Sequence, residues 1–157
     1  MPLLISSHKT PVGTLNLLAD DQILIGANLS TVSAFKAGND VKIVKLIPVI
    51  SDLISDYFDG DLHALNGIHV RQPGAAFSQA AWKAMRKIEP GKTFSYSDLA
   101  EKAGSPAAVR AAGSACANNA IMLVVPCHRV VKTGGALGNY AYGVEKKQWL
   151  LSHEGFL

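Results

Sequence analysis

Gln72-Pro73-Gly74 divides the 157-residue sequence into two parts with different patterns of apolar residues. Proline has a fixed φ and no main-chain N–H, and glycine favours turns, so the pair interrupts helices and strands. A chain of this length is enough for one ordinary domain or two small ones. We therefore predict an N-terminal α/β domain over residues 1–73 and a mainly helical C-terminal domain over residues 74–157.

The first part has the pattern of a small α/β unit. Short apolar runs predict strands over Thr14–Ala19 and Gln22–Asn28, joined by a turn at Asp20-Asp21, and another strand over Ile68–Arg71. Apolar residues at helical spacing predict one helix that ends at Gly60: Leu46, Ile50, Leu53, Ile54, Tyr57 and Phe58. No catalytic set is evident in this part.

The second part has the pattern of several helices. An apolar stripe predicts a helix over Phe77–Ile88, and a capping-box spacing predicts a short helix over Ser95–Ala103. After the turn at Gly104, a helix is predicted over Pro106–Ala117 with Ser105 as its N-cap. Two short helices around a glycine turn are the outline of a helix-turn-helix.

The two parts differ in charge. Residues 1–76 hold five basic and seven acidic residues, a net charge of −2, whereas residues 77–157 hold ten basic and five acidic residues, a net charge of +5. A basic second part suits contact with a polyanion, but a solvated basic surface explains it equally well. The predicted Pro106–Ala117 helix is built of small residues around Arg110, which suits either close helix packing or a nucleic-acid face.

Several classes of protein are disfavoured. No apolar run is long enough to span a bilayer, and the first ten residues lack the pattern of a secretory signal. Cys116 and Cys127 are too few for a disulfide framework and poorly placed for a zinc site. We therefore expect a cytoplasmic protein that binds neither metal nor membrane.

The segment Pro126-Cys127-His128-Arg129-Val130 carries the chemistry. A thiol with the ordinary pKa of about 8.5 is mostly protonated at neutral pH, so a nucleophilic cysteine needs a partner that takes its proton. His128 can be that partner, and the apolar residues Leu123–Val125 predict a buried strand that leads to Cys127. A Cys-His pair alone is weak evidence, whereas the whole pentapeptide is specific.

Pro126–Val130 resembles the active-site signature of the O6-alkylguanine-DNA alkyltransferases. Further segments occur in that family's order: Phe94–Ala100, Val109–Gly113, Asn119, Gly135–Tyr140 and Trp149–Gly155. The resemblance is strong over residues 77–157 and general before them. It implies a small RNase H-like α/β domain followed by a mainly helical domain with a helix-turn-helix.

The resemblance also implies roles for single residues. Cys127 would accept the alkyl group, His128 would take the thiol proton through a water, and Glu154 would orient and stabilise the imidazole. Asn119 would brace the turn before the active-site strand. Tyr96 would donate a hydrogen bond to the purine as it leaves.

The DNA-facing residues follow from the same resemblance. Main-chain groups near Cys127, Val130 and Ala141 would read the base edge, and Tyr140 would wall the pocket. Arg110 would fill the gap left by a flipped nucleotide, on a helix that enters the minor groove. The remaining residues of the expected DNA face are Ser95, Ala107, Ala111 and Ser114.

The implied activity is an irreversible, single-turnover methyltransferase reaction in DNA repair. The alkyl group of O6-alkylguanine, or of O4-alkylthymine as a second candidate substrate, would move to Cys127 without a cofactor or metal. The expected partner is double-stranded DNA that contains O6-alkylguanine, bound by a monomer. Two alternatives are a non-catalytic lesion sensor, disfavoured by the presence of Cys127, and a helix-turn-helix regulator, disfavoured by the lack of cysteines in residues 1–76.

Overall fold

The computed structural model describes residues 2–157, which form two compact units. The first unit contains the residues up to Gln72 together with Ala120–Val124, and the second contains Pro73–Asn119 and Val125–Leu157. A single boundary in the sequence therefore does not describe the division, because Ala120–Val124 joins the first unit. The independent folding of two domains, 1–73 and 74–157, stays a prediction.

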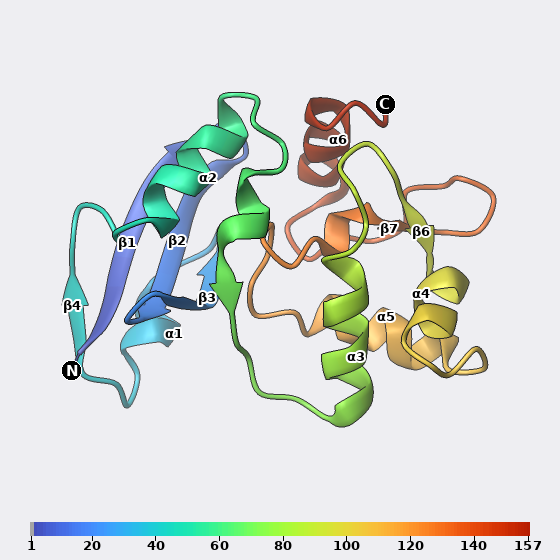
Figure 1. Cartoon of the computed structure of the whole chain (residues 1–157), viewed down its shortest axis with the longest axis horizontal. Coiled ribbons are helices and arrows are strands. Elements are labelled where there is room, and N and C mark those ends of the chain that lie inside the picture. The colour runs from blue at the N-terminus through green and yellow to red at the C-terminus, as the bar shows by residue number, and fades with distance from the viewer. Residues whose placement is uncertain (1) are drawn as a thin grey trace. The chain divides into compact units, whose positions relative to one another are not determined.

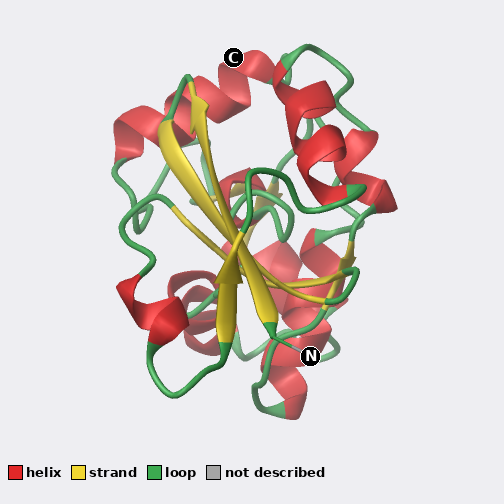
Figure 2. Cartoon of the chain, turned by 90° about the vertical axis from the view of Figure 1, so that its left-hand side faces the viewer, coloured by secondary structure: helices red, strands yellow, loops and turns green. Residues whose placement is uncertain are grey.

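The first unit is built on a five-stranded sheet with the order β4-β1-β2-β3-β5, whose twist is visible in Figure 2. Its strands are β1 (Leu3–Thr10), β2 (Gly13–Asp20), β3 (Ile23–Asn28), β4 (Val41–Ile43) and β5 (His69–Val70). The central three strands are antiparallel and the two edge strands are parallel to their neighbours. The predicted hairpin is present as β2 and β3, whereas β1 and β4 were not predicted.

A helix covers each face of this sheet. Helix α1 (Ser33–Lys36) places Phe35 against Ile5 and Leu18 on one face. Helix α2 (Ile50–Phe58) lies over the other face (Figure 1). A short 3-10 helix, Ala64–Gly67, follows α2. Sequence analysis placed the start of α2 near Leu46, which was wrong, because Pro48 and a positive φ of 68° at Val49 keep the preceding residues out of helical geometry.

The second unit is mainly helical. Its elements are α3 (Ala76–Met85), β6 (Phe94–Ser95), α4 (Tyr96–Lys102), α5 (Val109–Ala117), the 3-10 helix Cys127–Arg129, β7 (Val130–Val131) and α6 (Val144–His153). Helix α3 packs against α4 and α5, and the indole N–H of Trp82 donates to the Ala115 carbonyl at 2.9 Å. The short strands β6 and β7 pair in parallel, with Phe94 opposite Val130. This pairing brings the start of α4 beside the 3-10 helix of Cys127.

The start of α4 was predicted correctly and the start of α5 was not. The Ser95 hydroxyl accepts from the Asp98 N–H and the Asp98 carboxylate accepts from the Ser95 N–H, which is a capping box. Helix α5 begins at Val109 rather than Pro106, without a side-chain cap. Pro106 instead occupies a turn in which the Ala108 N–H donates to the Ser105 carbonyl at 2.9 Å. A proline after serine suits that turn as well as it suits a first helical turn.

The apolar run before Cys127 is buried, but it is not the predicted strand. Ile121 makes one isolated bridge with Ala27, and the chain then turns through Leu123, whose φ is 73°. Cys127 lies in the 3-10 helix that follows, and its N–H donates to the Val125 carbonyl at 2.8 Å. The run is therefore buried as a turn and not as a strand paired within a sheet.

Across residues 2–157, the helices are all too short or too polar to cross a bilayer.

Candidate functional site

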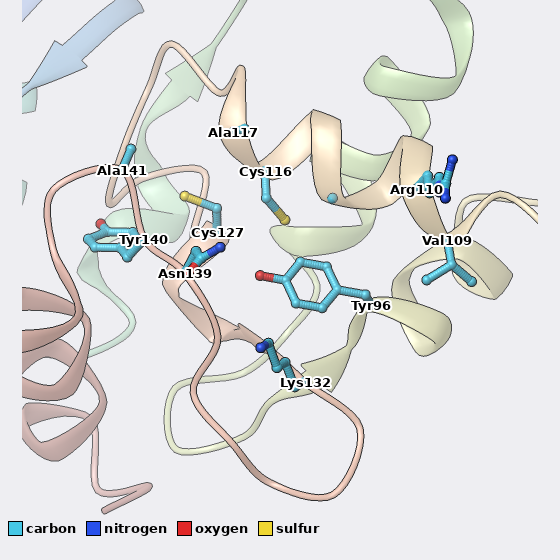
Figure 3. A pocket seen from close by; sticks show the side chains of 11 residues that line it. Tyr96, Val109, Arg110, Cys116, Ala117, Cys127, Lys132, Asn139, Tyr140 and Ala141 are labelled. Atoms are coloured by element: carbon cyan, nitrogen blue, oxygen red, sulfur yellow. The ribbon is translucent and has the colours of Figure 1, made fainter.

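A cavity of about 390 Å³ in the second unit contains the Cys127 side chain (Figure 3). Its walls come from the start of α4, one face of α5, and residues 132–141 after β7. Figure 3 shows Tyr140 and Ala141 at the end near Cys127, and Val109 and Arg110 at the other end. The lining residues are Tyr96, Val109, Arg110, Gly113, Cys116, Ala117, Cys127, Lys132, Asn139, Tyr140 and Ala141.

Cys127 is nearly buried, with 7% of its surface exposed. Burial raises the pKa of the Cys127 thiol, while a hydrogen bond from Asn119 and the charge of Lys147 act to lower it. The Asn119 amide also donates to the Val125 carbonyl at 2.8 Å, across the turn before Cys127. The Cys127 thiol is therefore protonated at rest, and the groups that favour its thiolate are already in place.

His128, Glu154 and Arg129 form a buried network behind Cys127. The His128 Nε2 lies 2.8 Å from Glu154 Oε2, and both side chains are fully buried. Arg129 donates to both carboxylate oxygens, from Nε to Oε1 at 2.8 Å and from Nη2 to Oε2 at 2.9 Å. Its Nη1 donates to the Ile88 carbonyl at 2.7 Å. The Glu154 carboxylate is thus bound by a guanidinium and an imidazole at once.

The protonation of this network follows from its contacts. Burial acts to raise the pKa of Glu154, but the contacts with His128 and Arg129 outweigh it and hold that pKa well below its usual range. Burial lowers the pKa of His128, against the opposing effect of Glu154. We therefore describe a Glu154 carboxylate that accepts from the Nε2–H of a neutral His128. The other ring nitrogen, Nδ1, is buried and has no hydrogen-bond partner among residues 2–157.

Lys147 belongs to the site and was missed by sequence analysis. Its side chain is fully buried, and its Nζ donates to the Val130 carbonyl at 2.7 Å and to the Asn139 carbonyl at 3.2 Å. Burial lowers the pKa of Lys147, and negative charge on Cys127 and Cys116 would raise it. A signal did exist in the sequence, because Lys147 lies seven residues before Glu154 on the face of α6 that also buries Leu150 and Leu151.

Tyr96 stands at the start of α4 with its hydroxyl directed into the cavity (Figure 3). Burial raises the pKa of Tyr96, and negative charge on Cys116 or Cys127 would raise it further, so the phenol keeps its proton. The loop that follows β7 approaches it closely at Gly138, where φ is 78° and a Cβ would stand 3.2 Å from the Tyr96 oxygen. The Tyr96 hydroxyl is therefore available to donate a hydrogen bond into the cavity.

Helix α5 buries Ala112 and Ala115 and exposes small residues on its outer face. Arg110, Ala111 and Ser114 are exposed on that face. The outer face therefore carries one long charged side chain, Arg110, among residues that allow a close approach.

The predicted site residues fall into three groups. Tyr96, Arg110, Cys127, Tyr140 and Ala141 line the cavity. Behind it lie His128, Glu154, Asn119 and the buried Val130, whose carbonyl accepts from Lys147. Ser95, Ala107, Ala111 and Ser114 do not line the cavity; Ser95 caps α4, and Ala107 lies in the turn before α5.

Cys116 also lines the cavity, although its chemistry differs from that of Cys127. Burial and negative charge on Cys127 raise the pKa of Cys116 to about 12, against the opposing charge of Lys147. Within residues 2–157, no group of three or more histidine, cysteine or acidic side chains is arranged to hold a metal ion.

Comparison with known proteins places this site in a known context. Residues 76–156 match the model of the 6-O-methylguanine DNA methyltransferase, DNA binding domain. The chain is 44% identical to the methylated-DNA–protein-cysteine methyltransferase of Salmonella typhimurium over 108 residues, which are 69% of this chain and 63% of that protein. It is 41% identical to a probable methyltransferase of the same name from Acanthamoeba polyphaga mimivirus over 70% of this chain and 74% of that protein.

A solved structure is similar over nearly the whole chain. The Mycobacterium tuberculosis OGT in complex with DNA has a TM-score of 0.84 and 28% sequence identity, and the match covers 97% of this chain and 92% of that one. The mixed α/β fold of the present chain is therefore shared with that protein.

Proposed function

Because the chain belongs to the 6-O-methylguanine DNA methyltransferase family, we propose that it repairs O6-alkylguanine in DNA by irreversible transfer of the alkyl group to Cys127. The matched segment spans 63% of the Salmonella relative, so the activity is argued from this chain's own site. The observation that carries the proposal is the placement of Cys127 in a cavity, directly before a buried histidine whose Nδ1 is unpartnered.

In the proposed reaction, Cys127 is the acceptor and His128 is the base. The thiol proton passes through a water to His128 Nδ1, the free ring position, while Nε2–H stays on Glu154. The sulfur attacks the alkyl carbon, the bond from that carbon to guanine O6 breaks, and the electron pair remains on the guanine. The guanine then takes up one proton from solvent, and the His128 imidazolium releases one proton to solvent. The products are unmodified guanine and an S-alkylcysteine, so each chain reacts once.

Four polar side chains support the transition state. Glu154 stabilises the imidazolium as it forms, and Arg129 keeps the carboxylate ionised and oriented. Lys147 places a positive charge that favours the Cys127 thiolate. Tyr96 donates a hydrogen bond from its hydroxyl to the leaving purine, on which negative charge grows.

DNA binding is assigned to a helix-turn-helix formed by α4 and α5, preceded by an RNase H-like first unit. The helix-turn-helix is supported by three features: helix α4, the turn at Gly104 with a φ of 94°, and helix α5 with its exposed small residues. The target carbon is unreachable in a stacked duplex, so the nucleotide is flipped into the cavity and Arg110 fills its place. Ser95, Ala107, Ala111 and Ser114 contact the minor-groove backbone.

Mass spectrometry tests the proposal directly. Incubation with an oligonucleotide containing O6-methylguanine should add one methyl group per chain, in the peptide that holds Cys127. The thiol of Cys116, with its pKa of about 12, should stay unmodified. Methylation of Cys116, turnover beyond one equivalent, or binding without transfer would contradict the mechanism, and the last outcome would favour the lesion sensor.

Arg110→Ala is expected to slow repair in duplex DNA much more than reaction with a free O6-alkylguanine base. The reason is that Arg110, exposed on α5 at one end of the cavity, is proposed to fill the gap in an opened base stack, and a free base presents no such gap. Single-turnover rates with both substrates measure the ratio, and Lys102→Ala on α4 is the matched control for loss of one exposed charge. Equal slowing with both substrates would instead assign Arg110 to the pocket itself.

The cellular setting and assembly state stay predictions. An acceptor that must remain a free thiol favours the reducing cytoplasm, and one chain holds every group in the proposed reaction. We therefore expect a monomer in that compartment.

A further inference from the structure

Strand β1 leaves part of its outer edge open. It pairs with β2 along Leu4–Thr10, but on its other side β4 covers only Leu3–Ile5. The Val44 N–H donates to the Ile5 carbonyl across that edge, so main-chain groups of the alternate residues Ser7 and Lys9 point the same way. Strand β4 ends before these residues, and on this side no other described segment of the chain pairs with Ser7 or Lys9. An open strand edge is a template for another strand.

A cavity of about 460 Å³ lies along this open edge, between residues 7–11 and helix α2. Ile54 and Phe58 of α2 form an apolar side, and the buried Ser51 lies beside them. The Ser51 hydroxyl accepts from the Ile47 N–H at 2.8 Å and is 3.1 Å from His8 Nε2, which joins the helix to β1. The groove is therefore a built feature of the first unit, with a strand edge on one side and a helix on the other.

The chain from the end of β4 to the start of α2 exposes three apolar side chains, one of which lines the groove. Ile43, Leu46 and Val49 are 65%, 55% and 51% exposed, and Leu46 also lines the cavity. Three large apolar residues exposed within seven positions, next to an unpaired strand edge, are typical of a surface that another chain covers.

The backbone at Val49 is strained in the same segment. Its φ is 68° and its ψ is −55°, and the Ile50 N–H donates to the Pro48 carbonyl at 2.8 Å. This is a γ-turn of the rare, positive-φ form, in a β-branched residue that normally avoids it. Such strain is retained where a segment has a use beyond folding. Here it holds an exposed valine two positions before Ser51, which lines the groove.

The charges around the groove select the kind of chain that fits. Lys9 and Lys45 are exposed and line it, Asp59 is the one carboxylate among its described lining residues, and His8 is half-buried there. An acidic segment complements the two lysines better than a basic one.

We propose that the groove beside β1 binds an extended acidic segment of a partner protein, which adds a strand at Ser7 and Lys9. Main-chain hydrogen bonds to these two residues supply the pairing, alternate apolar side chains of the segment cover Leu46 and Phe58, and its carboxylates meet Lys9 and Lys45. This surface is separate from the alkyl-acceptor cavity and makes no use of its residues.

A designed peptide tests this surface. The probe is the acetylated, amidated hexapeptide Glu-Val-Thr-Val-Glu-Val, and its controls replace both Glu by Lys or N-methylate alternate amides. Titration into the isotope-labelled full chain should slow hydrogen exchange at the Ser7 and Lys9 amides. The Lys9→Glu, Lys45→Glu double variant should weaken binding by at least roughly tenfold. The variant Lys42→Glu, which reverses a charge on β4 outside the groove, should not.

Each outcome decides the proposal. The proposal is supported if the acidic peptide slows hydrogen exchange at the Ser7 and Lys9 amides and neither control peptide does so. Unchanged exchange, or equal binding by the double variant with an unaltered unfolding midpoint, overturns it. Concentration-dependent protection in the chain alone, with a dimer in sedimentation, would identify a second copy as the occupant and also overturn it.

Discussion

Glu154→Gln is expected to slow alkyl transfer by roughly 10²–10⁴-fold, the usual contribution of a positioned acid or base. The substitution keeps the shape of the side chain and removes its charge. His128 then loses the carboxylate, 2.8 Å from Nε2, that stabilises its imidazolium. Proton transfer from Cys127 becomes less favourable, so the reaction needs a higher pH to generate thiolate. The rate profile of the variant should therefore move upward in pH.

The same substitution is expected to destabilise the fold by about 3–5 kcal/mol, because it leaves a buried charge without its partner. Arg129 is 5% exposed at its side chain and would keep only its bond to the Ile88 carbonyl and a neutral amide oxygen. Urea unfolding measures the loss, and single-turnover rates at a temperature where both proteins are folded separate it from catalysis. Glu145→Gln, an exposed change on the same helix, is the matched control.

The pH dependence of stability adds an independent check. Since the folded-state pKa of Glu154 lies below the ordinary value of 4.5, its stabilisation is present above that value and is lost as pH falls below it. The stability difference between the wild type and Glu154→Gln should therefore be largest near neutral pH and shrink in acid. A stability difference that stays constant with pH would mean that Glu154 does not pair with Arg129 as a carboxylate. Overlapping rate profiles would mean that Glu154 does not assist His128.

Local patterns in the sequence predicted local features of the fold and the site. The capping box at Ser95 and the β2–β3 hairpin depend on neighbours in the chain, and both are present. Cys127 and His128 are adjacent, so their motif named them without knowledge of the fold. Even so, the sequence placed Cys127 after a strand, because an apolar run does not distinguish a buried strand from the buried turn that occurs at Leu123.

Long-range pairings were beyond sequence reasoning. Arg129 binds the carboxylate of Glu154, which lies 25 positions later in the sequence, and no local pattern near either residue predicts this ion pair. Lys147 was missed for a related reason. Lysines are rarely buried, so its position on the apolar face of α6 did not indicate burial. Burial is possible because the Val130 and Asn139 carbonyls accept hydrogen bonds from its ammonium group. Strand β1 was missed because it alternates only partly before its polar end, and pairing with β2 and β4 stabilises it.

Lys147→Met is expected to move the pH dependence of Cys127 reactivity upward. The charge of Lys147 lowers the pKa of the Cys127 thiol against the effect of burial, so its removal leaves that effect less opposed. At neutral pH the transfer rate should fall in proportion to the lost thiolate.

The substitution also removes two hydrogen bonds, so electrostatic and structural effects must be separated. Without the ammonium, the Val130 and Asn139 carbonyls lose a donor, and the loop that carries Tyr140 and Ala141 loses its tie to α6. A loosened loop lowers transfer from DNA but does not shift the pH profile of the thiol. Iodoacetamide labelling of Cys127 from pH 6 to 10, followed peptide by peptide to exclude Cys116, reports the thiol alone.

Two further variants complete the test of Lys147. Lys147→Arg keeps the positive charge and should hold the labelling profile near that of the wild type, even if its larger head group slows repair. Lys146→Met removes the neighbouring, half-exposed charge and should change neither rate nor profile. If Lys147→Met and the wild type label with the same pH dependence, Lys147 acts only by holding Val130 and Asn139. The thiolate would then depend on Asn119 and on His128 with its buried Glu154 carboxylate.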